Sequence, residues 1–195
     1  MGTSRMEAFS DGVLAIIITI MVLGLEVPKG TQAADLIPFV PRLMSYVLSF
    51  IYVGIYWNNH HHLLHATGRI NGGIMWANLH LLFWLSLVPI VTAWMGENHF
   101  QPLPTAAYGF VLLMSALAYF ILQGAIIRHQ GEGSVVAKAV GKDVKGKLSA
   151  LFYLLAIGVA FLSPLVSGIL YICVAIMWVI PDRRVERALM KEHSS

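Results

Sequence analysis

Six apolar runs, each long enough or nearly long enough to cross a bilayer, follow one another along this chain. They cover residues 6–26, 39–64, 74–95, 105–127, 148–163 and 166–180. A bilayer core about 30 Å thick needs roughly 17 to 25 apolar residues in a helix. Hydrophobic residues make up 57% of the sequence and charged residues only 12%, against roughly 25% charged residues in soluble domains. The chain is therefore predicted to be an all-α integral membrane protein.

The number of spans and their direction follow from the turn residues and the positive charges. Ser163-Pro164 and Ser167-Gly168 separate the last two apolar runs. Five spans would move the last four basic residues to the outer side, against the preference of Lys and Arg for the cytoplasm. Six membrane helices with both termini cytoplasmic are therefore predicted, with only Lys29 and Arg42 outside. The cytoplasmic segments then hold eleven basic residues: Arg5, Arg69, Arg128, Lys138, Lys142, Lys145, Lys147, Arg183, Arg184, Arg187 and Lys191.

These basic residues lie between apolar runs, so they indicate membrane topology and not a nucleic-acid-binding surface. The amino terminus is not predicted to be a cleavable signal, because Asp11 interrupts the approach to the first apolar run. Residues 1–195 are predicted to form a single six-helix domain, with a mobile cytoplasmic linker over 128–147 and a charged tail over 181–195. Phosphate-binding glycine loops, serine nucleophile elbows and metalloprotease helix motifs are absent from the sequence, so no enzymatic activity is predicted.

Three smaller patterns have structural interpretations. Pro89 is expected to kink the third span, with neighbouring helices satisfying the freed backbone group. Glu26 is expected to be a solvated residue at the outer end of the first span. Aromatic residues are expected to anchor the spans at the membrane interfaces; they are Trp57, Trp76, Trp94, Tyr108 and Trp178.

The first span begins with a polar cluster that contains Arg5, Ser10 and Asp11. Polar and ionisable residues at the edge of a bilayer cost free energy unless partners satisfy them, so such residues are candidates for a functional site. At about 100° per residue, Asp11 points away from an apolar stripe on the same helix. The stripe is formed by Phe9, Gly12, Ile16, Thr19, Ile20, Leu23 and Val27.

Partners for the polar cluster are expected on the second and third spans. The second span ends in a run that contains His60, His61 and His65, and the third begins near Asn78 on the same side of the membrane. A buried polar network persists only if nearly every member is paired, and His60 is the histidine expected to join it. His61 and His65, four residues apart, could instead place two metal ligands on one helix face. Neither a nearby glutamate motif nor a cysteine supports that alternative, so no metal site is predicted.

The first half of the chain resembles the transmembrane protein 175 family of potassium channels. The resemblance rests on Arg5-x-x-x-Phe9-Ser10-Asp11-Gly12-Val13-x-Ala15-Ile16-x-x-Thr19, and it continues through Trp57-x-x-His60-His61, Asn78-Leu79 and Leu87-Val88-Pro89-x-x-Thr92. The Arg-x-x-x-Phe-Ser-Asp element is specific, because it places costly residues in a fixed arrangement within a membrane protein. The second half of the chain matches by helix count only.

The resemblance implies a homotetrameric potassium-preferring cation channel in a prokaryotic cell membrane, with the first helix lining a central pore. It implies no cofactor, with potassium as the permeant ion; the implied partners are further copies of the chain in a homotetramer, other monovalent cations and the lipid bilayer. Ile16, Ile20 and Leu23 would form a hydrophobic constriction, and Thr19 would favour potassium. The residues implied to brace the pore helix are Arg5, Phe9, Ser10, Asp11, His60 and Asn78.

Two other functions stay open from the residues alone. Asp11 and His60 could carry protons in a proton-coupled membrane transporter, although transporters usually place such sites near the bilayer midplane. The histidine run could serve a membrane scaffold or metal-binding protein. Proton-driven uptake would indicate the first function, and zinc retained through purification would indicate the second.

Overall fold

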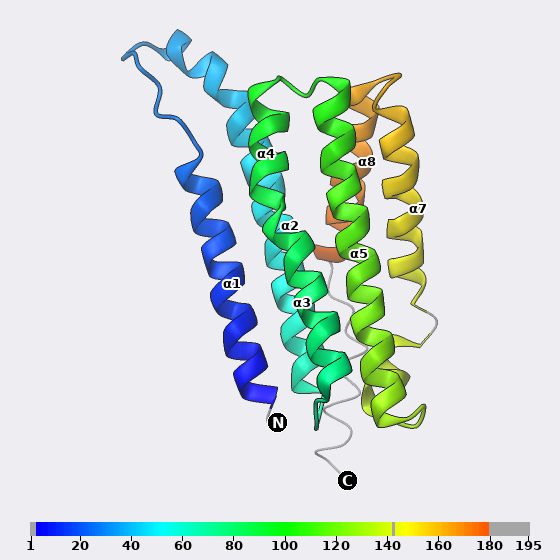
Figure 1. The fold of residues 1–195 in the computed structure, drawn as a ribbon. Helices are drawn as coiled ribbons and strands as arrows, with labels where there is room; N and C mark the ends of the chain where they lie inside the picture. Colours follow the sequence, from blue (N-terminus) through cyan, green and yellow to red (C-terminus); the bar gives the residue numbers. More distant parts are fainter. Residues whose placement is uncertain (1–2, 142, 180–195) are drawn as a thin grey trace.

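The computed structural model describes residues 3–141 and 143–179 of the chain. Within these residues the fold consists of helices, and the long ones run along a common direction, side by side (Figure 1). In chain order they are α1 (Thr3–Leu23), the 3-10 helix η1 (Ala33–Phe39), α2 (Val40–His65), α3 (Gly72–Ser86), α4 (Val88–Glu97), α5 (Pro102–Gln130), α6 (Val135–Val140), α7 (Val144–Val159) and α8 (Pro164–Val179). The prediction of an all-helical membrane protein is confirmed.

Four helical stretches are long and apolar enough to cross a membrane. They are Thr3–Leu23, Ala33–His65, Gly72–Glu97 and Pro102–Gln130. α7 and α8 are shorter, with 16 residues each. The predicted first span ends too late, because α1 stops at Leu23 and Glu26 lies beyond it. Gly24 favours this end, since glycine destabilises a helix interior, and Pro28 follows four residues later.

The third predicted span is divided into α3 and α4 at Leu87. Pro89 lies in the first turn of α4, where its missing N–H leaves no helical hydrogen bond unmade. The Thr92 hydroxyl donates to Val88 O at 2.7 Å and thereby engages a carbonyl beside the break. The predicted distortion at Pro89 is confirmed, and it takes the form of a break between two helices.

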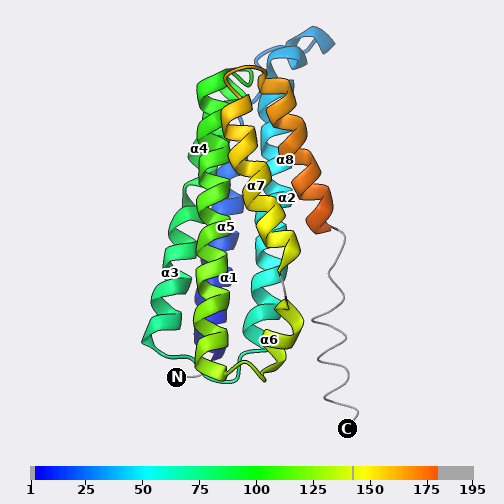
Figure 2. The same ribbon diagram turned by 90° about the vertical axis from the view of Figure 1, so that its right-hand side faces the viewer.

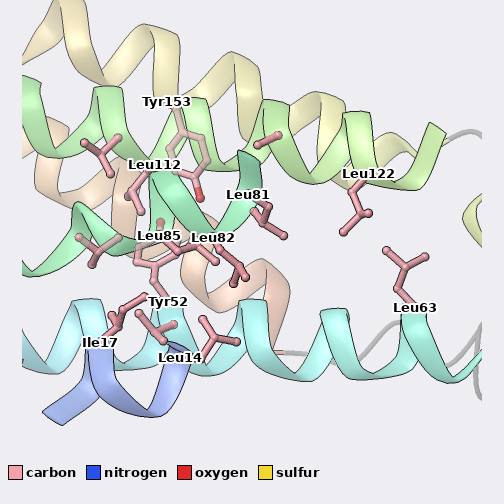
Figure 3. Close-up of a cluster of buried hydrophobic side chains, with 14 of the residues drawn as sticks. Leu14, Ile17, Tyr52, Leu63, Leu81, Leu82, Leu85, Leu112, Leu122 and Tyr153 are labelled. Carbon is pink, nitrogen blue, oxygen red and sulfur yellow. The ribbon is translucent and has the colours of Figure 1, made fainter. Parts of the chain in front are cut away.

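α5 forms the centre of the bundle. It packs on α3 and α4 on one side and on α7 and α8 on the other, and Figure 2 shows α7 crossing in front of it. α1 packs on α2, α3 and α4. A continuous apolar core joins these layers, and it includes Leu14 and Ile17 of α1 and Tyr52 of α2 (Figure 3).

A group of tyrosines lies within this core. The Tyr52 hydroxyl donates to Tyr171 O at 2.6 Å, and the Tyr171 hydroxyl donates to Thr105 O at 3.0 Å. Tyr108 is fully buried and accepts a hydrogen bond from Ser49 at 3.0 Å. The expectation that Tyr108 anchors at a membrane interface is therefore wrong. Its hydroxyl finds a partner inside the bundle, which removes the cost of burying it.

The expected mobile linker over 128–147 contains helices. α5 continues to Gln130, α6 follows, and α7 begins at Val144. Side-chain caps explain these helix starts: Ser134 Oγ accepts from Ala137 N at 3.2 Å, and Asp143 Oδ1 accepts from Gly146 N at 3.1 Å. The charged tail over 181–195 lies outside the described residues.

Candidate functional site on the first helix

α1 has one face in the bundle and one face without a partner in the described chain. The buried face consists of Met6, Ser10, Leu14, Ile17 and Met21. These positions are three or four residues apart, which is the spacing of one helix face. The orientation of α1 is therefore determined by this face, and the residues opposite it are left exposed.

The predicted apolar stripe lies on the exposed face. Phe9 is 55% exposed, Ile16 60%, Ile20 51% and Leu23 78%. Gly12 and Thr19 are exposed beside them. Val27 lies beyond the end of α1 and is not a member of the stripe. Membrane-facing apolar residues are common, so the stripe acquires a function only through what covers or surrounds it.

Thr19 is the hydroxyl residue of this face. Its Oγ1 donates to Ala15 O, one turn earlier, at 2.8 Å. This local hydrogen bond satisfies the hydroxyl proton and leaves the oxygen lone pairs available as acceptors. The exposed face therefore carries an oxygen acceptor within an otherwise apolar surface.

On the buried face, a chain of hydrogen bonds joins α1, α3 and α2. Asn78 Nδ2 donates to Ser10 Oγ at 2.9 Å, and Ser10 Oγ donates to Met6 O at 2.8 Å. Because the Asn78 amide nitrogen faces Ser10, its Oδ1 is the acceptor for His60 Nε2 at 2.7 Å. All three side chains are buried. This orientation places a proton on His60 Nε2, and His60 Nδ1 has no partner among the described residues.

Two further contacts lie beside this chain and link α1 to α2. Trp57 Nε1 donates to Asp11 Oδ1 at 3.0 Å, and His61 Nδ1 pairs with Glu7 Oε1 at 2.7 Å. Glu7 and Trp57 were not predicted as site residues. Helical spacing could have placed both on the site face. Glu7 precedes Ser10 and Asp11 by three and four residues, and Trp57 precedes His60 and His61 by the same numbers.

The predicted bracing residues therefore occupy two environments. Ser10, Asn78 and His60 meet in the interior, whereas Asp11 bonds to Trp57 and, within the described residues, forms no hydrogen bond with the other three. Arg5 and Phe9 are exposed, and Arg5 has no hydrogen bond or ion pair within the described residues. This interior chain of hydrogen bonds holds α1 against α3 and, through Asn78, links it to α2. The surroundings of Arg5 and Phe9 depend on what lies against the exposed face.

The histidine run at the end of α2 faces several directions. His60 is buried, while His61 pairs with Glu7 and stacks on His65 with ring centroids 6.0 Å apart. Within the described ranges, His, Cys, Asp and Glu side chains form no group of three or more that could hold a metal ion. The pairing of His61 with a carboxylate gives this part of the run a role in holding α1 to α2.

The segment that follows α1 is tied to α2 by an ion pair. Arg42 Nη1 donates to Glu26 Oε2 at 2.7 Å. The Arg42 guanidinium holds the pKa of the Glu26 carboxyl below its ordinary value through this hydrogen bond and through its charge. Glu26 was expected to be solvated, and its exposure confirms this expectation. Its ion pair with Arg42 was not predicted. Contacts of carboxylates with α2 thus lie near the start of α1, at Glu7, and just beyond its last residue, at Glu26.

Apolar helices of membrane-spanning length and a first helix with one unpartnered face define an all-helical integral membrane protein. Residues 5–89 match the family model described as endosomal/lysosomal potassium channel TMEM175. The chain is 54% identical over 189 residues to a potassium channel of Chryseobacterium sp. (strain P1-3), covering 97% of this chain and 98% of that protein. It is 34% identical over 172 residues to a potassium channel of Streptomyces collinus, covering 83% and 84% of the two chains.

A solved structure has the same fold. It is the crystal structure of a lysosomal potassium-selective channel TMEM175 homolog from Chamaesiphon minutus, with a TM-score of 0.77 and 27% sequence identity, covering 92% of this chain and 97% of that one. The chain belongs to the TMEM175 family. This is a family of membrane ion channels and not of enzymes, which confirms the resemblance found in the first helix.

Proposed function

We propose that this protein is a potassium-preferring monovalent cation channel of the prokaryotic cell membrane. In this proposal residues 1–195 form one six-helix domain, α7 and α8 also cross the membrane, both termini are cytoplasmic, and four copies assemble around a central pore lined by α1. The observation that carries the proposal is the exposed apolar face of α1, which lies opposite a buried polar chain on the same helix. The potassium channels related to this chain support the choice of ion.

Four copies of the exposed face around one axis would make a narrow hydrophobic constriction. Ile16, Ile20 and Leu23 are one turn apart or nearly so and are each more than half exposed. A constriction of this kind blocks ions when it loses its water and conducts when water enters. Leu23 is the most exposed of the three, so it would present the largest fraction of its side chain to the pore.

Ion preference would come from Thr19. Its oxygen can accept a contact from a cation while its proton is held by Ala15 O. A ring of four such oxygens replaces only part of the hydration shell of an ion. The preference for potassium is therefore expected to be weaker than in a filter built from successive rings of backbone carbonyls.

The bracing residues would resist rotation of α1, which would otherwise move the stripe away from the axis. Ser10, Asn78 and His60 do this within one subunit, and Asp11 adds the contact with Trp57. Arg5 and Phe9 are exposed in the single chain, and we assign them contacts at the cytoplasmic entrance between neighbouring copies. No cofactor is required by this mechanism, since the permeant ion passes by diffusion.

The test is potassium flux from liposomes that contain the purified protein. Leu23→Ala is expected to raise flux severalfold, because a smaller side chain lowers the cost of wetting the constriction. Leu165→Ala is the matched control, since Leu165 is 75% exposed but lies on α8. Absence of flux for every monovalent cation would contradict the channel, and unchanged flux in Leu23→Ala would contradict the position of the constriction.

A second measurement addresses selectivity. Thr19→Val keeps the shape of the side chain and removes its oxygen, so reversal potentials under potassium and sodium gradients should show a lower preference for potassium. An unchanged ratio would remove Thr19 from the selectivity mechanism. The proton-coupled transporter is not favoured by the relatives, and Asp11 and His60 have separate hydrogen-bond partners.

A further inference from the structure

A cavity of about 540 Å³ lies between α3 and α5, away from the site on α1. It is at the end of the bundle where α3 begins and α5 ends, which is also the end where α1 begins (Figure 1). First and last helical turns of membrane-spanning helices lie at the boundary between hydrocarbon and headgroups. The cavity is therefore placed at the depth of lipid headgroups.

The polar part of the cavity presents hydrogen-bond donors. Arg128 uses its Nε to donate to Gly124 O at 3.2 Å, and its two Nη groups have no hydrogen-bond partner among the described residues. An arginine with free Nη groups offers a planar pair of donors suited to a phosphate. Arg128 is exposed and lines the cavity.

His129 adds a ring N–H donor, and its neighbours determine which ring nitrogen carries the proton. Asn71 Oδ1 accepts from Ile74 N at 2.9 Å, so the Asn71 amide nitrogen is the group that faces His129 Nδ1 at 3.1 Å. Because Nδ1 accepts this hydrogen bond, the proton of His129 lies on Nε2. His80 is arranged in the same way, since Trp84 Nε1 donates to its Nε2 at 3.0 Å and leaves the proton on Nδ1.

The remaining lining is apolar or aromatic and contains no acid. Ile121 and Ala125 of α5 form an apolar wall, and Trp76 of α3 is 74% exposed at the rim. None of the residues that line the cavity, all within the described part of the chain, is Asp or Glu. A donor-rich pocket without negative charge, next to an apolar wall and an exposed indole, matches an anionic amphiphile in charge and in polarity.

We propose that this cavity binds an anionic phospholipid. The phosphate lies against Arg128 and the ring donors of His129 and His80, and the first part of an acyl chain lies along Ile121 and Ala125. Basic pockets between membrane helices bind lipid headgroups in this manner. The proposal depends only on membrane insertion and not on the position of the pore.

The test uses native mass spectrometry of the purified full chain with equal amounts of phosphatidylglycerol and phosphatidylcholine. The wild-type protein should retain phosphatidylglycerol preferentially. Arg128→Gln should weaken the retention of phosphatidylglycerol about fivefold. One basic residue near an anionic surface contributes about 1 kcal/mol of binding free energy, which corresponds to about that factor. Ala125→Leu should weaken retention of both lipids, because the larger side chain fills space beside the apolar wall and leaves the charge of Arg128 unchanged.

Arg69→Gln is the matched control. Arg69 is an exposed arginine at the same end of the bundle that does not line the cavity. Equal losses in Arg69→Gln and Arg128→Gln would show nonspecific surface attraction and overturn the site. Equal retention of the two lipids would overturn the choice of an anionic headgroup. A change of oligomeric state in Arg128→Gln would show that a second copy of the chain occupies this face, and it would also overturn the proposal.

Discussion

The hydrogen bond between Ser10 and Asn78 should measure how strongly α1 is held against α3. We predict that Ser10→Ala and Asn78→Ala destabilise the fold non-additively. Both side chains are buried, and Asn78 Nδ2 donates to Ser10 Oγ at 2.9 Å. Once either partner is removed, removing the other costs less, because their mutual bond is already lost.

The magnitudes follow from the contacts. Hydrogen bonds between helices in a membrane contribute about 0.6 kcal/mol on average and about 1.7 kcal/mol at most, and the coupling energy should lie in that interval. Asn78→Ala alone should cost more, because it also removes the acceptor of His60 Nε2. His60 Nδ1 already has no partner among the described residues. Leaving a buried polar atom unpaired costs about 1 to 3 kcal/mol, so together with the lost bond to Ser10 the total loss should be about 2 to 5 kcal/mol.

The assay is reversible unfolding in mixed micelles, followed by far-ultraviolet circular dichroism, for wild type, both single variants and the double variant. Ser115→Ala is the matched control for Ser10→Ala. Ser115 is equally buried and its Oγ donates to the carbonyl four residues earlier, at 2.8 Å, but among the described residues it forms no hydrogen bond with Asn78. Ser115→Ala and Asn78→Ala should be additive. Additivity of Ser10→Ala with Asn78→Ala would refute the bracing role of this bond.

Two other outcomes are expected. The pKa of Glu26 is lowered by Arg42, so this pair stabilises the fold above the ordinary carboxyl pKa of 4.5, and its contribution is lost as pH falls through the lowered value. The melting temperatures of wild type and Arg42→Gln should therefore converge in acid. A difference that persists there would contradict the pairing. Gly109→Ala should destabilise the fold by about 1 to 3 kcal/mol, because its new Cβ would overlap the Tyr171 hydroxyl. Unfolding of this variant in the same micelles measures the loss, and unchanged stability would contradict the close approach of α5 and α8.

Helix positions and the faces of α1 could be predicted from the sequence because they depend on local properties. The length of an apolar run determines whether a helix can span the membrane, and a rotation of about 100° per residue determines which side chains share a face. The stripe through Ile16, Ile20 and Leu23 was predicted in this way, and these residues are exposed together. Polar partners of α1 were expected on the second and third spans; Asn78 of α3 bonds to α1 directly, and His60 of α2 bonds to Asn78.

Which polar groups meet was decided only by the tertiary structure. Asn78 bonds to Ser10, while the costly carboxylate of Asp11 takes Trp57 as its partner. Such pairs depend on the axial shift and rotation of one helix against another. These are properties of packing between distant segments, and periodicity within one segment does not contain them. The burial of Tyr108 has the same origin, since its acceptor role toward Ser49 exists only once the fold brings these two residues of α5 and α2 together.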